Sequence, residues 1–290
     1  MKKPVRILFT VLCIIFIGVF AYSGYKIYDT VFAAGGYYQS NKNAKEMQNA
    51  YVKPAEATAA PAASADPAAP ALDPSQTSAR PAEEIVLDPE VSPIDVDFKS
   101  LKERNSEVVG WLYCPDTVIN YPVMQTDDNM VYLHKDIDGN YSSYGTLFVE
   151  CLCQKDFKST NNIIYGHHMN DGKMLAKLVD YARQDYYNQH PVFYLNTPDI
   201  NYRVELFAGF VTDMNSDTYA ISFQSNEDNQ AWLDKIISQS TFESSVGVKP
   251  GDKILTLSTC TYEYDNARYV VMAKLVPMDG SSAVPEVPAV

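Results

Sequence analysis

Apolar positions along the chain fall into two regions of different character. The first is an uncharged run from Ile7 to Tyr25. About 19 helical residues cross roughly 30 Å of hydrocarbon, so this run predicts a transmembrane signal-anchor over 7–25. The basic residues that precede it are Lys2, Lys3 and Arg6. Positive charge favours the cytoplasmic side, which predicts a cytoplasmic N-terminus over 1–6 and an extracellular remainder on a single-pass cell-membrane protein.

A cleaved signal peptide is the alternative, since Val31-Phe32-Ala33 resembles a cleavage site. The apolar run is longer than the roughly 7–15 residues of a signal-peptide core, and the site lies well beyond its end. The pattern therefore favours an uncleaved anchor.

A stretch without apolar periodicity, residues 26–93, separates the two regions. Its Tyr37–Val52 part is interpreted as a short juxtamembrane helix, and an Ala/Pro-rich run extends from about Pro54 to Pro93. Such a run buries too little apolar surface to offset chain entropy, and its prolines favour extended geometry. It predicts a semi-stiff spacer, which could extend reach through a cell wall or serve only as a tether.

The second apolar region, 94–278, consists of short runs and predicts one folded domain, followed by a flexible tail over 279–290. Runs typical of strands are Val108–Leu112, Thr117–Met124, Gly145–Cys151, Asn162–Tyr165, Val192–Leu195, Tyr202–Val211, Lys253–Thr261 and Tyr269–Val276. Helical spacing is found at Phe98 and Leu101, over Lys173–Asn188, and over Glu227–Ser238 behind an Asn226 N-cap. About eight strands without βαβ alternation predict a mainly β fold, a closed and mostly antiparallel sheet with peripheral helices.

Charge narrows the function classes. The formal net charge is -13, and Lys and Arg form no cluster. Nucleic-acid binding requires such a cluster to displace phosphate counterions, so that class is excluded. An acidic surface suits an exposed domain that avoids nonspecific contact with polyanions.

Cysteine usage adds one candidate for chemistry. Cys13 lies in the predicted membrane span, and Cys114, Cys151 and Cys153 are interpreted as small buried hydrophobic residues. Cys151 and Cys153 share one face of a predicted strand and lack the spacing of a redox or zinc pair. The histidines and carboxylates show no ligand spacing, so no metal or other cofactor is expected.

Cys260 ends the apolar run Ile254-Leu255-Thr256-Leu257 and precedes a polar, Tyr-rich segment. A strand end can hold a side chain rigidly while leaving it accessible. A nucleophilic cysteine needs a thiolate, a group that protonates the leaving amine, and donors for the oxyanion. Cys260 is the candidate nucleophile.

Partners for Cys260 come from two other strand ends. His167 and His168 follow the apolar run that ends at Tyr165, and adjacent strand residues face opposite ways, so one of them can face a shared site. Arg268 opens the final strand, and a hairpin-like return can bring its guanidinium beside the thiol as an oxyanion donor or substrate clamp. From the residues alone, a buried inert cysteine, a surface histidine pair and a solvated arginine stay open as alternatives.

Longer motifs resolve these alternatives by resemblance. The chain resembles class B sortases from about Phe98 to Val276. The motifs that carry the resemblance are Thr256-Leu257-Ser258-Thr259-Cys260 with Arg268, Tyr165-Gly166-His167-His168-Met169, Gly110-Trp111-Leu112, Ile119-Asn120-Tyr121-Pro122-Val123 and Asp128-Asn129-Met130-Val131-Tyr132-Leu133.

The resemblance implies an eight-stranded sortase barrel and a cysteine transpeptidase at the surface of a Gram-positive-type cell. It implies Cys260 as nucleophile, His167 as general acid/base with His168 as its outward neighbour, and Arg268 as substrate clamp and oxyanion stabiliser. The substrate-contact residues that it implies are Asn129, Leu133, Ser258 and, more loosely, Tyr219. The helix around Trp232 matches an extra helix that class B members carry before the cysteine strand.

The implied partners are secreted proteins with a C-terminal sorting signal, cleaved at a Thr–Gly type bond, and an amine of a peptidoglycan precursor. Asp88-Pro89 and Asp66-Pro67 lack the aromatic residue that follows in the lid motif of pilus-building class C members. The alternatives are pilin polymerisation or simple hydrolysis by the same fold, and a non-catalytic surface-tethered binding module.

Overall fold

The computed structural model describes residues 15–24, 42–55, 91–261 and 263–278 of the 290-residue chain. The predicted cytoplasmic segment, most of the Ala/Pro-rich run and the predicted tail lie outside these residues.

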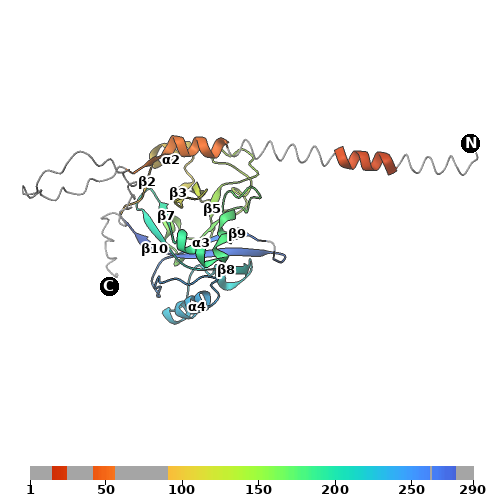
Figure 1. Cartoon of the computed structure of the whole chain (residues 1–290). Helices are drawn as coiled ribbons and strands as arrows, with labels where there is room; N and C mark the ends of the chain where they lie inside the picture. The colour runs from red at the N-terminus through yellow and green to blue at the C-terminus, as the bar shows by residue number, and fades with distance from the viewer. Residues whose placement is uncertain (1–14, 25–41, 56–90, 262, 279–290) are drawn as a thin grey trace, which may run out of the picture.

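Eight strands form the closed barrel that the apolar pattern predicted (Figure 1). Around the barrel they follow the order β10-β8-β7-β3-β4-β5-β6-β9. Neighbouring pairs are antiparallel except β4–β5 and β6–β9, which are parallel. The bounds are β3 Val108–Tyr113, β4 Asn120–Met124, β5 Leu147–Val149, β6 Asn161–Tyr165, β7 Val192–Asn196, β8 Tyr202–Asp213, β9 Ile254–Cys260 and β10 Ala267–Pro277.

Two helices cover the barrel where their apolar faces predict. Helix α4 (Asn226–Ser238) packs Trp232, Leu233 and Ile236 into a cluster with Phe207 of β8. Its N-cap is Ser225, whose hydroxyl accepts from Asp228 N, one residue before the expected Asn226. Helix α2 (Phe98–Arg104) begins at Asp97, whose carboxylate accepts from Ser100 N. Short 3₁₀ turns, η1 (Lys155–Phe157) and η3 (Asp217–Tyr219), complete the connections.

The predicted helix over Lys173–Asn188 is wrong as a single element. The chain forms a 3₁₀ segment, η2 (Ala176–Ala182), and a short α-helix, α3 (Gln184–Gln189). Met174 has a φ of 55° and Arg183 adopts extended backbone angles, so a continuous helix is interrupted at both places. The apolar residues still reach the core, since Leu175, Leu178 and Tyr181 are buried.

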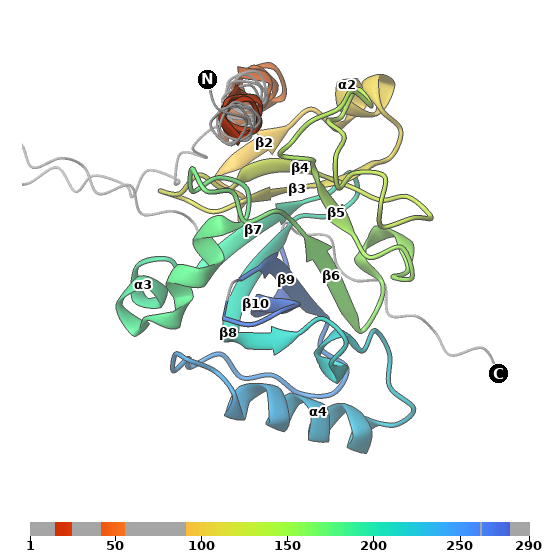
Figure 2. The same ribbon diagram turned by 90° about the vertical axis from the view of Figure 1, so that its right-hand side faces the viewer.

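Residues 42–55 belong to the packed region, ahead of the start expected at Ile94. Residues 42–51 form a helix, and Val52–Pro54 (β1) pair antiparallel with Ile94–Val96 (β2). Figure 2 shows this helix on the side of the barrel opposite α4. The Ala/Pro-rich run therefore joins two paired strands and does not separate the 42–51 helix from the domain.

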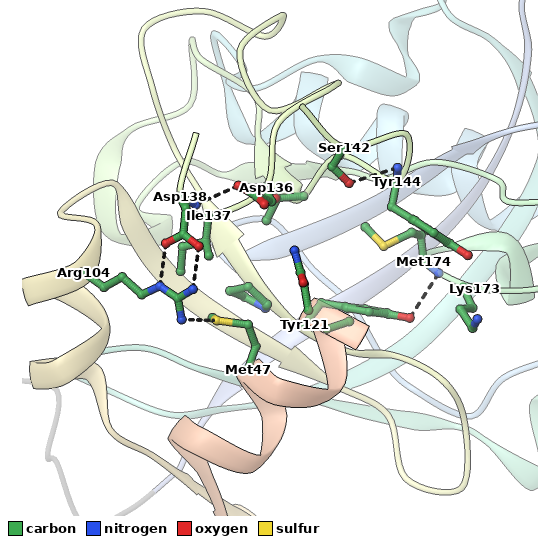
Figure 3. A pocket seen from close by; sticks show the side chains of 15 residues that line it. Met47, Arg104, Tyr121, Asp136, Ile137, Asp138, Ser142, Tyr144, Lys173 and Met174 are labelled. Atoms are coloured by element: carbon green, nitrogen blue, oxygen red, sulfur yellow. Dashed lines mark hydrogen bonds and ion pairs between the residues drawn. The ribbon is translucent and has the colours of Figure 1, made fainter. Parts of the chain in front are cut away.

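Met47 fixes the 42–51 helix to the barrel. Its side chain is buried, and its sulfur lies 2.9 Å from Nη1 of Arg104. The Arg104 guanidinium also forms two 2.6 Å bonds with the carboxylate of Asp138. Beneath the helix lies a small, partly open cavity lined by Met47, Tyr121, Met174 and neighbours (Figure 3).

The predicted membrane span is described only in part. Residues 15–24 are helical, with exposed apolar side chains such as Phe16 and Phe20, and 7–14 and Tyr25 lie outside the described residues. Within the described ranges, no helix has the length and hydropathy needed to cross a bilayer.

Candidate active site

Cys260 is the last residue of β9, the strand between β6 and β10. Residues 254–259 are buried, whereas Cys260 is half-buried. Polar contacts anchor the strand inside the barrel, since the Thr256 hydroxyl donates to Asn161 Oδ1 over 2.8 Å. A rigid strand end therefore presents the thiol at the barrel surface.

Arg268 lies directly opposite Cys260 in the antiparallel β9–β10 pair. Directly opposed residues project to the same face, with Cβ atoms about 4.5–5.5 Å apart. The half-buried guanidinium is held by a 3.0 Å bond from Nη1 to Ala267 O. The hairpin return predicted from the spacing places a fixed positive charge beside the thiol.

His167 follows β6, the strand parallel to β9. Its Nε2 lies 2.7 Å from the Leu133 carbonyl oxygen, and the ring of His134 stacks on it at 5.6 Å. Burial lowers the pKa of His167, the Leu133 bond opposes this, and the charge of His134 lowers the pKa further. Its imidazole is therefore biased toward the neutral form.

Gly166 allows the approach of this segment to the barrel. A Cβ at this position would lie within 2.7 Å of Leu175 Cγ and would also collide with Leu147. Any larger residue would therefore require a shift of these leucine side chains or of the segment that carries His167.

His168, which the resemblance implied as the outward neighbour of His167, does not line the groove with it, but its ring contacts the main chain of Cys260. Its Nδ1 lies 2.8 Å from the main-chain oxygen of Cys260. The alternation of strand side chains fails here because β6 ends at Tyr165, before the pair. Both histidines therefore lie near the predicted nucleophile.

The seven residues predicted for catalysis and substrate contact all line one groove, with about 930 Å³ of open space. Its lining comes from the strand ends of β6, β9 and β10, from β5 and η3, and from the segments that follow β4, β5 and β8. The predicted residues in its lining are Cys260, His167, Arg268, Asn129, Leu133, Ser258 and Tyr219.

Comparison with known proteins decides the family, because a model described as Sortase domain matches residues 112–276. The chain belongs to the sortase family. It is similar to the sortase B of Listeria monocytogenes, with 37% identity over 182 residues that cover 62% of this chain and 74% of the relative.

Two solved structures agree. A Staphylococcus aureus sortase B–substrate complex has a TM-score of 0.60 at 32% identity, covering 63% of this chain and 85% of that one. A Bacillus anthracis sortase B in complex with AAEK1 has a TM-score of 0.64 at 29% identity, covering 83% and 98%. The protein is a class B sortase, a cysteine transpeptidase.

The groove of this sortase also contains a carboxylate that the sequence did not reveal. Glu150 Oε2 accepts from Asn129 Nδ2 at 2.8 Å and from the Tyr165 hydroxyl at 2.9 Å. Burial acts to raise the pKa of Glu150, but hydrogen bonds from Asn129, Tyr165 and Cys151 together lower it. Asn129 Oδ1 also accepts from Cys151 N, so the Asn129 amide is oriented at both ends.

A further hydrogen bond in the sortase groove joins two of the predicted residues. The hydroxyls of Tyr219 and Ser258 lie 2.9 Å apart. Burial raises the pKa of Tyr219 to about 12, which keeps the phenol neutral. Leu133 contributes its carbonyl to His167 in addition to its side chain in the groove.

The other described cysteines follow their predicted burial in two cases of three. Cys114 and Cys153 are buried, but Cys151 is half-buried and lies in the turn after β5, with its sulfur 3.3 Å from Glu150 Oε1. Among the described residues, no cluster of His, Cys, Asp or Glu is arranged to hold a metal ion.

The groove also contains residues to which the sequence assigned no catalytic or substrate-contact role. They are Met130, Phe148, Glu150, Tyr165, Gly166, Met214 and Thr259. Tyr165 had a usable signal, since it stands two residues before His167. For Glu150 there was none, because its role depends on Asn129 and Tyr165 meeting it across the barrel wall.

Proposed function

We propose that this sortase cleaves the sorting signal of a secreted protein at a Thr–Gly type bond and transfers the new carboxyl terminus to a cell-wall amine. The observation that carries the proposal is the direct opposition of Cys260 and Arg268 in a groove that His167 also lines. The three residues supply a nucleophile, a fixed cation and a proton carrier.

In the first step, the Cys260 thiolate adds to the threonine carbonyl, and the guanidinium of Arg268 stabilises the oxyanion. The C–N bond to glycine then breaks, and protonated His167 gives its proton to the leaving amine. A thioester to Cys260 remains. In the second step an amine attacks the thioester, His167 accepts its proton, and the thiolate is released with the new amide.

The hydrogen bond to the Leu133 carbonyl indicates which nitrogen of His167 carries a proton. Its oxygen only accepts, so Nε2 carries the proton of the 2.7 Å bond. Nδ1 is the nitrogen left to exchange protons with the thiol and the amines. The lowered pKa of His167 favours a neutral ring that can accept the thiol proton.

Substrate contact is assigned to Asn129, Leu133, Ser258 and Tyr219. Asn129 donates one amide hydrogen to Glu150, and its second amide hydrogen can be donated to a peptide carbonyl. In support, a similar Staphylococcus aureus sortase B forms a complex with its substrate.

We also propose that residues 7–25 anchor the protein as a single-pass cell-membrane enzyme, with 1–6 cytoplasmic and the catalytic domain extracellular. The support is the uncharged run and the exposed apolar side chains of 15–24. Deleting 7–25 should release the enzyme from the membrane fraction. Retention of the deleted form would contradict the anchor.

The function is tested with sorting-signal peptides and the full-length protein, with and without an added amine. The amine should appear in the product. Cys260→Ala should abolish turnover, and His167→Ala and Arg268→Ala should each reduce it by about 10²–10⁴-fold.

Three outcomes would support the alternatives. A product that ends in a free carboxylate, formed by water instead of the amine, identifies a hydrolase. Product joined only to a pilin lysine identifies a polymerase. A Cys260 that resists thiol-reactive probes in the folded protein identifies a binding module.

A further inference from the structure

We propose that His168 is a positioning residue that holds the main chain of Cys260 in place, a role distinct from that of His167. The inference rests on the proposed function only in taking Cys260 as the nucleophile. The observation behind it is the 2.8 Å contact between His168 Nδ1 and Cys260 O.

The parallel β6–β9 pairing shows what this contact replaces. Register runs from Asn161 opposite Ile254 to Tyr165 opposite Ser258, and Gly166 N donates to Ser258 O over 3.1 Å. In a parallel ladder the donors of one strand recur every second residue. The next donor would therefore be the main-chain N–H of residue 168, and its acceptor would be the oxygen of Cys260.

The main chain leaves the ladder before that bond can form. His168 pairs instead with Met174 in an isolated antiparallel bridge, and Leu175 N donates to His167 O over 3.1 Å. The imidazole of the same residue reaches back to Cys260 O. Because a carbonyl oxygen can only accept, Nδ1 donates, and the ring supplies the hydrogen bond that its own backbone no longer makes.

The consequence is a short, fixed connection between proton carrier and nucleophile. Residues 166–168 bind β9 at successive points: Gly166 N to Ser258 O, Thr259 Oγ1 to Gly166 O at 2.9 Å, and the His168 ring to Cys260 O. His167 lies inside this segment. The separation of its ring from the thiol is therefore set on both sides by bonds to the same strand.

A reversed assignment, with His168 as the acid/base, conflicts with this geometry. The donated Nδ1 proton is engaged by a main-chain oxygen of the nucleophile itself, and His168 does not line the groove. The two roles make different demands on the residue. Positioning needs only an N–H donor, whereas proton exchange needs an imidazole.

Asparagine separates the two roles, because its amide nitrogen, like Nδ1, is bonded to Cγ, and the amide does not titrate. In the full-length enzyme, His168→Ala should lower kcat about 10- to 100-fold with little change in KM, since a misplaced nucleophile slows chemistry more than binding. His168→Asn should recover most of the loss, and its kcat/KM should keep the wild-type acid limb. His190→Asn, which removes an imidazole outside the groove, is the matched control.

Cys260 alkylation by iodoacetamide, located by peptide mapping, gives a second readout that needs no substrate. The rate should fall in His168→Ala and recover in His168→Asn. Wild-type rates in His168→Ala, or a His168→Asn enzyme as inactive as His167→Ala, would overturn the proposal. If His168→Ala fails to fold, the His168→Asn result alone decides, because a low kcat in that folded variant contradicts positioning. Normal alkylation in an enzyme that never joins the amine would contradict the proposed function and leave the positioning role intact.

Discussion

Arg268 and Cys260 lie directly opposite each other on neighbouring strands, so backbone register fixes the position of the arginine relative to the thiol. The guanidinium is further held by Ala267 O, which restricts its orientation. The role proposed for Arg268 depends on planar donor geometry as well as on charge.

Arg268→Lys is expected to lower kcat/KM by about 100-fold although the charge is kept, because an ammonium on a flexible stem cannot reproduce the guanidinium fork. Steady-state transpeptidation of a sorting peptide measures the loss. Arg183→Lys, on the exposed surface, is the matched control and should be unaffected. An Arg268→Lys enzyme within about threefold of wild type would show that charge alone suffices.

His134 stacks on His167, and its charge contributes to the lowered pKa of that ring. In His134→Phe the stacked ring remains but the charge is lost, so the pKa of His167 should rise. With a higher pKa, His167 becomes protonated at a higher pH as the solution is acidified. The acid limb of kcat/KM should therefore move to higher pH, by at most about one pH unit. A pH–rate profile measures this. A downward movement of the limb would contradict the sign.

Much of the site could be predicted because its residues belong to continuous motifs at strand ends. Cys260, His167 and Arg268 were predicted in this way, and all of them line the groove. The contact of His168 with Cys260 O could not be predicted, since it depends on the turn to Met174 that ends β6. The place of Glu150 in the groove was not predicted, because a carboxylate after a strand is usually solvated.

The 42–51 helix was predicted to lie next to the membrane, outside the folded domain, but it packs on the barrel. Its apolar contact with the barrel is concentrated in Met47, which packs with Leu101 and Trp111 in one buried cluster. Gln48 adds a 2.8 Å bond to Asn120 O at the start of β4.

Met47→Ala is expected to lower the free energy of unfolding by about 2–3 kcal/mol, because the substitution removes buried thioether and methylene groups and leaves a cavity. Chemical denaturation of the full-length protein measures the change. Asn49→Ala, on the exposed face of the same helix, should change stability by less than about 0.5 kcal/mol. Equal effects of the two variants would show that the helix is not packed on the barrel.

Elements with strong periodicity were predicted well, and those defined by local polar contacts were not. The barrel strands appear near their predicted bounds, but β4 starts at Asn120, after a turn in which the Thr117 hydroxyl donates to Cys114 O. The apolar stripe over Lys173–Asn188 was predicted correctly, but the single helix was not. Apolar periodicity carries no information about the positive φ of Met174.

For the whole molecule, the pairing of β1 with β2 brings together segments that lie far apart in the sequence. Ala55 N donates to Pro93 O over 3.0 Å, so the intervening chain starts and ends at one edge of the domain. No periodic pattern predicts such a pairing, because β1 and β2 are three residues each.

Replacing residues 58–88 with about four Gly and Ser residues should raise the free energy of unfolding by about 1–2 kcal/mol, because closing a shorter loop costs less entropy. Thermal and chemical unfolding measure this. A Gly/Ser replacement of the original length is the matched control and should leave stability nearly unchanged. A loss of stability in the short variant alone would indicate strain in β1–β2.

The same pairing determines how far from the membrane the enzyme can work under the proposed anchor. Chain that returns to its starting point adds nothing to the height of the groove, however many prolines it contains. Residues 26–41 alone connect the proposed anchor to the 42–51 helix, and at full extension they measure at most about 60 Å. With that anchor in place, the working radius would be that of a short tether, and targets would have to come to the zone next to the membrane.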